Sequence, residues 1–232
     1  MSFLIDITFF VPTLNEEKHI LTVLNNLKKL SDSMHKYIEV IIIDDASIDS
    51  TKQKIHNFIN SSDSNLIFYQ FIENSSTLGL AKNFKTSINL AIGKQFRLIN
   101  GDNSEPYDSL HLIVNESERF DVTIPYYKTI INRKLSRTII SKMFTLVVNL
   151  ITRKNLHYYN GAPLYKTEIL KKVTFFSNGM SYSAEVLVRF LKLSKNYREV
   201  EVIGFDNDSS SWNIRNITDV LVTLFRFATR KI

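Results

Sequence analysis

Short apolar runs alternate with amphipathic segments along the first hundred residues. The apolar runs, each of a length typical of a strand buried on both faces, are residues 5–11, 40–43, 66–71 and 96–99. The intervening segments, which repeat apolar side chains at three- and four-residue spacing, are residues 16–30, 51–59 and 81–91. This alternation predicts an α/β fold in which a mostly parallel sheet carries helices on both faces.

From about residue 108 the pattern changes without a break in composition. The helical segments expected there are residues 110–120, 137–151, 184–193 and 217–228. The strand-like segments are residues 122–125 and 198–205, with a short element of undefined type at 164–173. No linker rich in glycine, proline or serine separates the two parts, so we predict one domain over residues 1–232 with two halves, 1–106 and 107–232.

Polar clusters follow three of the predicted strands at the point where each strand ends. They are residues 12–17, 44–49 and 100–105. Ligands of such sheets bind beyond the carboxyl ends of the strands. The carboxylates of Asp44, Asp45 and Asp102 can accept hydrogen bonds from a base or ribose and can hold a hard divalent cation. The alternative is structural, because aspartates also terminate strands and stabilise turns.

Composition restricts the chemistry. The chain has no cysteine, which excludes disulfides, thiolate–metal sites and cysteine nucleophiles. A formal net charge of +6 favours phosphate-bearing ligands, yet no nucleic-acid motif is present and we expect no nucleic-acid partner. No secretion signal is visible, and no apolar segment is expected to reach the roughly 20 residues needed to span a bilayer. These features predict a cytoplasmic protein, soluble or peripheral on the inner face of the membrane.

Four motifs in the first half carry a resemblance to a known family. In order, they are PTLNEE at 12–17, IIIDDASIDST at 41–51, GLAKN at 79–83 and NGD at 100–102. Together they resemble the motifs of family-2 glycosyltransferases, which have the GT-A fold, a Rossmann-like sheet. The resemblance implies an inverting hexosyltransferase that uses a UDP- or GDP-linked sugar and a divalent cation, Mg²⁺ or Mn²⁺.

The second half is similar to one branch of that family, the polyprenyl-phosphate sugar synthases of the dolichyl-phosphate mannose and glucose type. The matching segments are FDV at 120–122, NGAPLYK at 160–166, residues 182–189 and EVEV at 199–202. This branch implies transfer to a polyprenyl phosphate, and a place in the biosynthesis of cell-envelope polysaccharide. Residues 1–106 would then bind the nucleotide sugar and residues 107–232 the acceptor, with peripheral membrane contact.

The resemblance also implies roles for individual residues. The side chains expected to line the nucleoside pocket are Pro12, Leu14, Glu16, Ile43 and Asp45. Those expected at the diphosphate are Asn100, Gly101 and Asp102, with Asp102 and Asn100 as metal ligands and Asp102 also in catalysis. Glu185 is expected near the reaction centre. The synthases carry two arginines that this chain lacks, and the basic residues expected to bind the acceptor phosphate instead are Lys128, Arg133 and Arg137.

Two alternatives to a polyprenyl-phosphate acceptor remain open. A transferase that elongates a surface glycan would use a sugar hydroxyl as acceptor, and Glu185 would then be the candidate general base. A nucleotide-binding scaffold without activity is the other, because Asn100 stands where the family has its first metal-binding aspartate. Residues 133–151 and 217–228 combine apolar and basic side chains, which suits either a membrane interface or helices with a basic outer face.

Overall fold

The computed structural model describes residues 4–179, 181–206 and 214–229, and it contains one seven-stranded sheet. The strands are β1 (Ile7–Thr13), β2 (Ile38–Asp44), β3 (Ile67–Glu73), β4 (Gln95–Leu98), β5 (Val122–Ile131), β6 (Leu164–Lys166) and β7 (Tyr197–Phe205). Their order in the sheet is β3-β2-β1-β4-β6-β5-β7. All pairs are parallel except those of β6, which is antiparallel to both neighbours. The predicted fold class, a mostly parallel α/β sheet, is confirmed.

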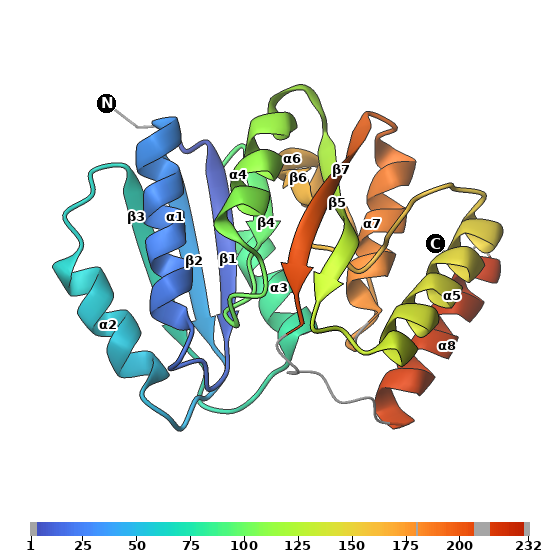
Figure 1. The fold of residues 1–232 in the computed structure, drawn as a ribbon, viewed down its shortest axis with the longest axis horizontal. Coiled ribbons are helices and arrows are strands. Elements are labelled where there is room, and N and C mark those ends of the chain that lie inside the picture. The colour runs from blue at the N-terminus through green and yellow to red at the C-terminus, as the bar shows by residue number, and fades with distance from the viewer. Residues whose placement is uncertain (1–3, 180, 207–213, 230–232) are drawn as a thin grey trace.

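Helices cover both faces of this sheet (Figure 1). The helices are α1 (Ile20–Met34), α2 (Thr51–Ser61), α3 (Leu80–Leu90), α4 (Tyr107–Glu116), α5 (Leu135–Thr152), α6 (Thr167–Leu170), α7 (Tyr182–Leu193) and α8 (Ile214–Ala228), with a 3₁₀ turn at Ser117–Arg119. Apolar side chains of α1, α2 and α4 pack on one face, and those of α3 and α7 pack on the other. Helices α5 and α8 pack against each other at the far end from β3.

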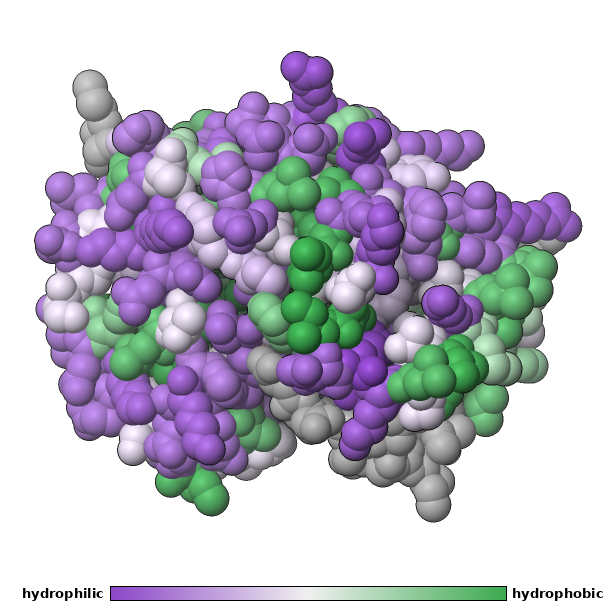
Figure 2. Space-filling model, in the orientation of Figure 1, coloured by the Kyte–Doolittle hydropathy of each residue, from purple (hydrophilic) through white to green (hydrophobic). Residues whose placement is uncertain are grey.

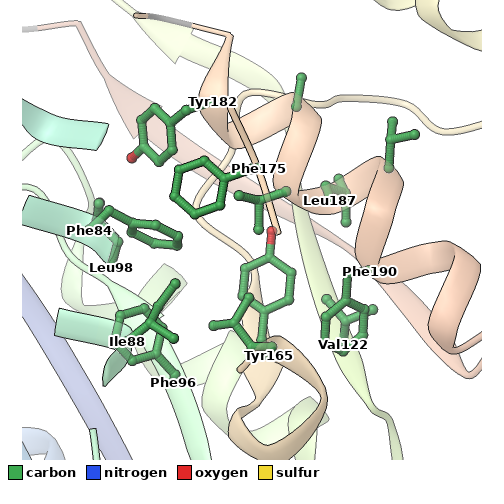
Figure 3. Close-up of a cluster of buried hydrophobic side chains, with 14 of the residues drawn as sticks. Phe84, Ile88, Phe96, Leu98, Val122, Tyr165, Phe175, Tyr182, Leu187 and Phe190 are labelled. Carbon is green, nitrogen blue, oxygen red and sulfur yellow. The ribbon is translucent and has the colours of Figure 1, made fainter. Parts of the chain in front are cut away.

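Two buried cores follow from the alternation of side chains along each strand. Phe9 and Ile42 point to the α1 side, whereas their neighbours Phe10 and Ile43 point to the α3 side. The core on the α3 side contains a cluster of rings shown in Figure 3, in which Phe84 packs at 5.2 Å from Tyr182 and 5.5 Å from Phe96 between ring centroids. This core joins the first half of the chain to the second.

The elements differ from the sequence predictions mainly at their ends. Helix α1 begins at Ile20 rather than at residue 16, because the Glu16 carbonyl accepts the His19 and Ile20 N–H groups in a turn. Strand β5 continues to Ile131, since β7 pairs with it in parallel along this extension. Helix α5 is also longer than residues 137–151. Contrary to our expectation, α5 is long and apolar enough to cross a membrane. Among the described residues, one helix meets this criterion of length and composition.

Candidate active site

A cavity of about 970 Å³ lies beyond the carboxyl ends of β1, β2 and β4. The side chains predicted for the nucleotide sugar that line it are Pro12, Leu14, Glu16, Asp45, Asn100, Gly101 and Asp102. The end of β5 and helices α5, α7 and α8 form its other walls. The three polar clusters predicted from the strand ends therefore do meet in one place, together with parts of the second half of the chain.

The first two of these clusters are fastened to each other by hydrogen bonds. The Asn15 N–H donates to Ser47 Oγ at 2.8 Å, and the Glu16 N–H donates to Thr51 Oγ1 at 2.8 Å. In return, Asn15 Oδ1 accepts the Ile48 N–H at 2.9 Å. These bonds use the polar residues of the first two motifs, and they join the loop that carries Glu16 to the loop that follows β2.

Asp44 has a structural role in the loop that follows β2. Its side chain is fully buried, and its carboxylate accepts from Thr13 Oγ1 at 3.0 Å and from the Ser47 N–H at 2.8 Å. Of the two aspartates that end β2, Asp44 therefore supports the loop, and Asp45 is the one that reaches the cavity.

Asp45 binds the loop that leads into α3. Its Oδ1 accepts from the Leu78 N–H at 2.8 Å and from Asn74 Nδ2 at 2.8 Å, and its Oδ2 accepts from the Gly79 N–H at 2.9 Å. Burial alone would raise the pKa of this carboxyl, but these donors and Asn83 lower it below its ordinary value. Asp45 is thus a charged wall residue that fixes the Gly79 end of the cavity.

Glu16 and Asp102 place two carboxylates on the same side of the cavity. Burial raises the pKa of Glu16 to about 7, and the charges of Asp102 and Asp49 add to the effect. Crowded carboxylates of this kind are relieved by a cation. Together with Asn100 they offer only oxygen ligands, as Mg²⁺ and Mn²⁺ prefer. No group of three acidic, histidine or cysteine side chains suited to a metal occurs in the described ranges, so a cation here would need further oxygens from a diphosphate.

The turn at residues 100–102 is in close contact with β1. A Cβ added to Gly101 would stand 2.7 Å from the Pro12 carbonyl oxygen, which is closer than side chains approach backbone. Beyond the turn, Asp102 Oδ1 accepts the Ser104 N–H at 3.0 Å. Glycine at this position therefore lets the turn sit next to the first motif, where Asp102 comes within electrostatic range of Glu16.

Three predicted site residues do not line the cavity, namely Ile43, Glu185 and Lys128. Ile43 is buried in the core on the α3 side, since the alternation of β2 turns its side chain away from the strand end. Glu185 is completely buried in α7, where Oε2 accepts the Ser177 N–H at 2.8 Å and Oε1 accepts Arg189 Nε at 2.9 Å. In these positions the Ile43 side chain faces the core and the Glu185 carboxylate does not line the cavity.

The three basic residues expected at the acceptor phosphate are placed differently. Lys128 lies on the exposed surface, where its Nζ is 3.3 Å from Glu201 Oε1. Arg137 lines the cavity, but its Nη1 donates to both carboxylate oxygens of Asp206 at 2.7 Å. Arg133 also lines the cavity, and its buried Nε finds no hydrogen-bond partner within the part of the chain that the structure describes. Of the three, Arg133 and Arg137 line the cavity, and Arg137 is already held by Asp206.

Several cavity residues were not predicted from the sequence. Tyr127, midway along β5, packs edge to face on Tyr158, with 5.5 Å between ring centroids. Burial, with a contribution from Glu105, raises the pKa of Tyr127 well above its ordinary value, so the phenol stays neutral. The sequence signal for this pair is weak: aromatic residues at 126–127 and 158–159, on segments far apart in the chain.

Comparison with known proteins agrees with this geometry. Residues 8–174 match glycosyl transferase family 2. A protein of Methanocaldococcus jannaschii without assigned activity is 28% identical over 204 residues, 82% of this chain and 83% of that protein. The abequosyltransferase of Salmonella typhimurium is 30% identical over 107 residues, 46% of this chain and 31% of that enzyme. Poly(ribitol-phosphate) beta-N-acetylglucosaminyltransferase of Staphylococcus aureus is 26% identical over 197 residues, 84% of this chain and 33% of that enzyme. The chain thus spans about a third of the length of the two relatives with named activities.

Solved structures share the fold at low sequence identity. Glucosyl-3-phosphoglycerate synthase of Mycobacterium tuberculosis, with Mn²⁺, UDP and glucosyl-3-phosphoglycerate, has a TM-score of 0.69 at 14% identity, over 97% of this chain and 79% of that one. The Staphylococcus aureus enzyme with UDP-GlcNAc has a TM-score of 0.66 at 17% identity, over 96% of this chain and 66% of that one. The family match covers most of the chain, and its motifs meet at one cavity: the chain belongs to glycosyl transferase family 2 and is a glycosyltransferase.

Proposed function

We propose that this glycosyltransferase moves a sugar, with inversion, from a UDP- or GDP-sugar to a polyprenyl phosphate. The observation that carries the proposal is the position of Arg133. Arg133 lines the same cavity as Asp45 and Asp102, and its Nε has no hydrogen-bond partner among the described residues. A guanidinium is well suited to phosphate, because its N–H groups match phosphate oxygens in pairs.

On the donor side, the walls fit a nucleotide diphosphate. Pro12 and Leu14 offer apolar contact for a base, and Asp45 is an ionised acceptor for base or ribose donors. Glu16, Asn100 and Asp102 would hold Mg²⁺ or Mn²⁺ together with the diphosphate. When bound, such a cation acts as a Lewis acid that stabilises the charge developing on the leaving diphosphate. In this proposal residues 1–106 bind the donor and residues 107–232 the acceptor.

On the acceptor side, the cavity supports a nucleophile that is already anionic. A phosphate monoester needs no general base, whereas an alcohol must lose a proton during attack. Glu185 is outside the cavity. Of the cavity carboxylates, Glu105 and Asp206 are paired with arginines, and this proposal assigns Glu16, Asp45 and Asp102 to the donor and its cation. Arg133 would position the phosphate for in-line attack on the anomeric carbon.

The remaining walls suit an acceptor with a hydrocarbon chain. Apolar side chains of α5 and α8 line the cavity next to Arg133; they are Ile140, Met143, Phe144, Val147, Val220, Leu221 and Leu224. Burying such surface against a prenyl chain is favourable in proportion to the apolar area removed from water. A phosphate headgroup at Arg133 with its tail along α5 would use both features, and it would place the enzyme on the inner face of a membrane.

A second candidate is transfer to a sugar or polyol hydroxyl. It is favoured by the name of one relative, a transferase that acts on poly(ribitol-phosphate). Its base would have to be a cavity carboxylate such as Asp206, which would first have to separate from Arg137. A scaffold without activity is not proposed, because residues 8–174 match a glycosyltransferase family.

The test compares acceptors that differ only in the phosphate. The purified chain is given Mn²⁺, a panel of UDP- and GDP-sugars, and either a short polyprenyl phosphate or the matching polyprenol in detergent. We expect product with the phosphate alone. Arg133→Ala should raise the acceptor KM about tenfold or more, the value of one charged hydrogen bond, while Lys128→Ala stays like wild type. Product from the polyprenol or from a glycan, but not from the phosphate, would overturn the proposal.

A further inference from the structure

Helix α5 turns an apolar face outward. Its exposed side chains include Leu135, Ile139, Met143, Leu146 and Leu150, with exposed fractions of 74%, 50%, 61%, 59% and 71%. Their three- and four-residue spacing puts them on one side of the helix. A helix on the surface of a globular protein normally turns its polar side to water, so this orientation is the reverse of the usual one.

Helix α8 extends the same surface. It packs against α5, and it exposes Leu221, Val222 and Phe225. Figure 2 shows apolar atoms gathered at the end of the molecule where Figure 1 places α5. We call the five α5 residues above and these three α8 residues the apolar face. Contiguous apolar surface of this kind is uncommon on soluble monomers and marks a site of interaction.

The charged residues of α5 and of the segments on either side of it have one sign. From residue 122 to residue 167 the sequence has eight lysines and arginines and no aspartate or glutamate. Lys134, Lys142 and Arg153 are exposed on or beside α5. A surface that combines exposed leucines with lysine and arginine matches a bilayer rich in anionic lipids, where each basic residue near the surface contributes about 1 kcal/mol.

Helix α5 is also held to the body of the protein. Val148 is fully buried in the core, and Thr145 is buried beside it. Asn149 is bound from two directions: its Oδ1 accepts the Tyr159 hydroxyl at 2.7 Å, and its Nδ2 donates to the Leu156 carbonyl at 2.9 Å. A membrane-crossing α5 would have to break all these contacts. The helix therefore fits a position parallel to the membrane surface, with its apolar face toward the lipid.

We propose that the apolar face of α5 and α8 docks the protein on the anionic surface of a lipid bilayer. Met143 and Leu221 belong both to this face and to the cavity lining, so the cavity opens where the acyl chains would begin. The docking itself is argued independently of the proposed function. Only its purpose, to admit a lipid-linked acceptor from the membrane, rests on that function.

The experiment is sedimentation of the protein with vesicles, without any substrate. Vesicles of phosphatidylcholine and phosphatidylglycerol in a 3:1 ratio (about one quarter anionic lipid) are compared with pure phosphatidylcholine. The test variant is Ile139→Gln, Leu146→Gln and Leu150→Gln together, which changes residues outside the cavity lining. The matched control changes three exposed apolar residues elsewhere, namely Phe68→Gln, Ile92→Gln and Leu112→Gln.

We expect wild type and control to bind anionic vesicles, and the test variant to lose at least tenfold in bound fraction with an unchanged far-UV spectrum. Wild type that ignores anionic vesicles would overturn the inference, as would a stable dimer by light scattering that the test variant abolishes. Transfer to detergent-solubilised acceptor is measured in parallel. Vesicle binding without transfer would sink the proposed function alone, and transfer without vesicle binding would sink the docking alone.

Discussion

The guanidinium of Arg97 and the carboxylate of Glu105 form a bidentate ion pair at the cavity, which Glu105 lines. Nη1 and Nη2 donate to Oε1 and Oε2 at 2.8 and 2.7 Å, and Arg97 is completely buried in β4. Its Nε donates to the Ala162 carbonyl at 2.9 Å. One side chain thus ties the segment that follows Asp102 to the turn at residues 160–163.

Removal of the Glu105 carboxylate should therefore destabilise the fold strongly. Glu105→Ala leaves the Arg97 charge buried and unpaired, which we expect to lower the free energy of unfolding by about 3–5 kcal/mol in urea titrations. The control is Lys28→Ala, which breaks the exposed pair with Asp63 and should leave the urea unfolding midpoint nearly unchanged. Equal effects of the two variants would show that the buried pair does not support the fold.

Gly101→Ala should damage both the donor site and the fold. The added methyl would meet the Pro12 carbonyl oxygen, so the turn that carries Asp102 must move. We expect at least a tenfold rise in donor KM, with a loss of stability of about 1–3 kcal/mol. Gly79→Ala provides a comparison. The φ of Gly79 is +91° and an added Cβ would meet no atom within 4 Å, so we expect backbone strain without crowding. A Gly101→Ala enzyme with wild-type donor KM would contradict the proposed place of this turn.

Glu185→Gln should lower stability and leave turnover nearly intact. The change removes the charge that faces Arg189, and we expect unfolding to become easier by about 3 kcal/mol while kcat stays within about threefold of wild type. Arg189→Met is the matched variant, because it leaves the Glu185 carboxylate buried without its cation. A kcat lowered a hundredfold in a stable Glu185→Gln protein would restore Glu185 as a general base.

Asp45 should give stability a dependence on pH. Its pKa is lower in the folded chain than in the unfolded chain, so ionised Asp45 stabilises the fold above the unfolded pKa, and this stabilisation is lost as pH falls through the folded pKa. The difference in unfolding free energy between wild type and Asp45→Asn should be constant near neutral pH and shrink below about pH 4. Urea titrations at several pH values measure it. A difference that grows on acidification would contradict the hydrogen bonds assigned to Asp45.

The donor side of the cavity could be predicted from sequence because its parts are local. Each motif there directly follows a strand, and parallel strands deliver their carboxyl ends to one edge. The order of strands and motifs along the chain is therefore enough to bring Asp45 and Asp102 to the same cavity. The motif could not tell Ile43 from its neighbours, however, since only the pairing of β2 decides which side each residue faces.

The acceptor side depends on pairs that are distant in sequence. The Arg137–Asp206 pair joins residues 69 positions apart, and this contact is what separates Arg137 from Arg133 as a phosphate ligand. Glu185 stands in the first turn of α7, a helix buried on several sides, so helical spacing did not reveal which way it points. Neither relationship leaves a signal in the local pattern of the chain.

Thermal unfolding with nucleotide sugars, with and without Mn²⁺, tests the central claim most directly. A ligand that binds only the folded state stabilises it by about 2.7 kcal/mol at a hundred times its Kd. We predict that a UDP- or GDP-sugar raises the melting temperature only when Mn²⁺ is present, and that Asp102→Ala abolishes the rise. If a well-folded protein shows no shift with any nucleotide sugar and metal, the assignment of this cavity as a metal-dependent donor site is wrong.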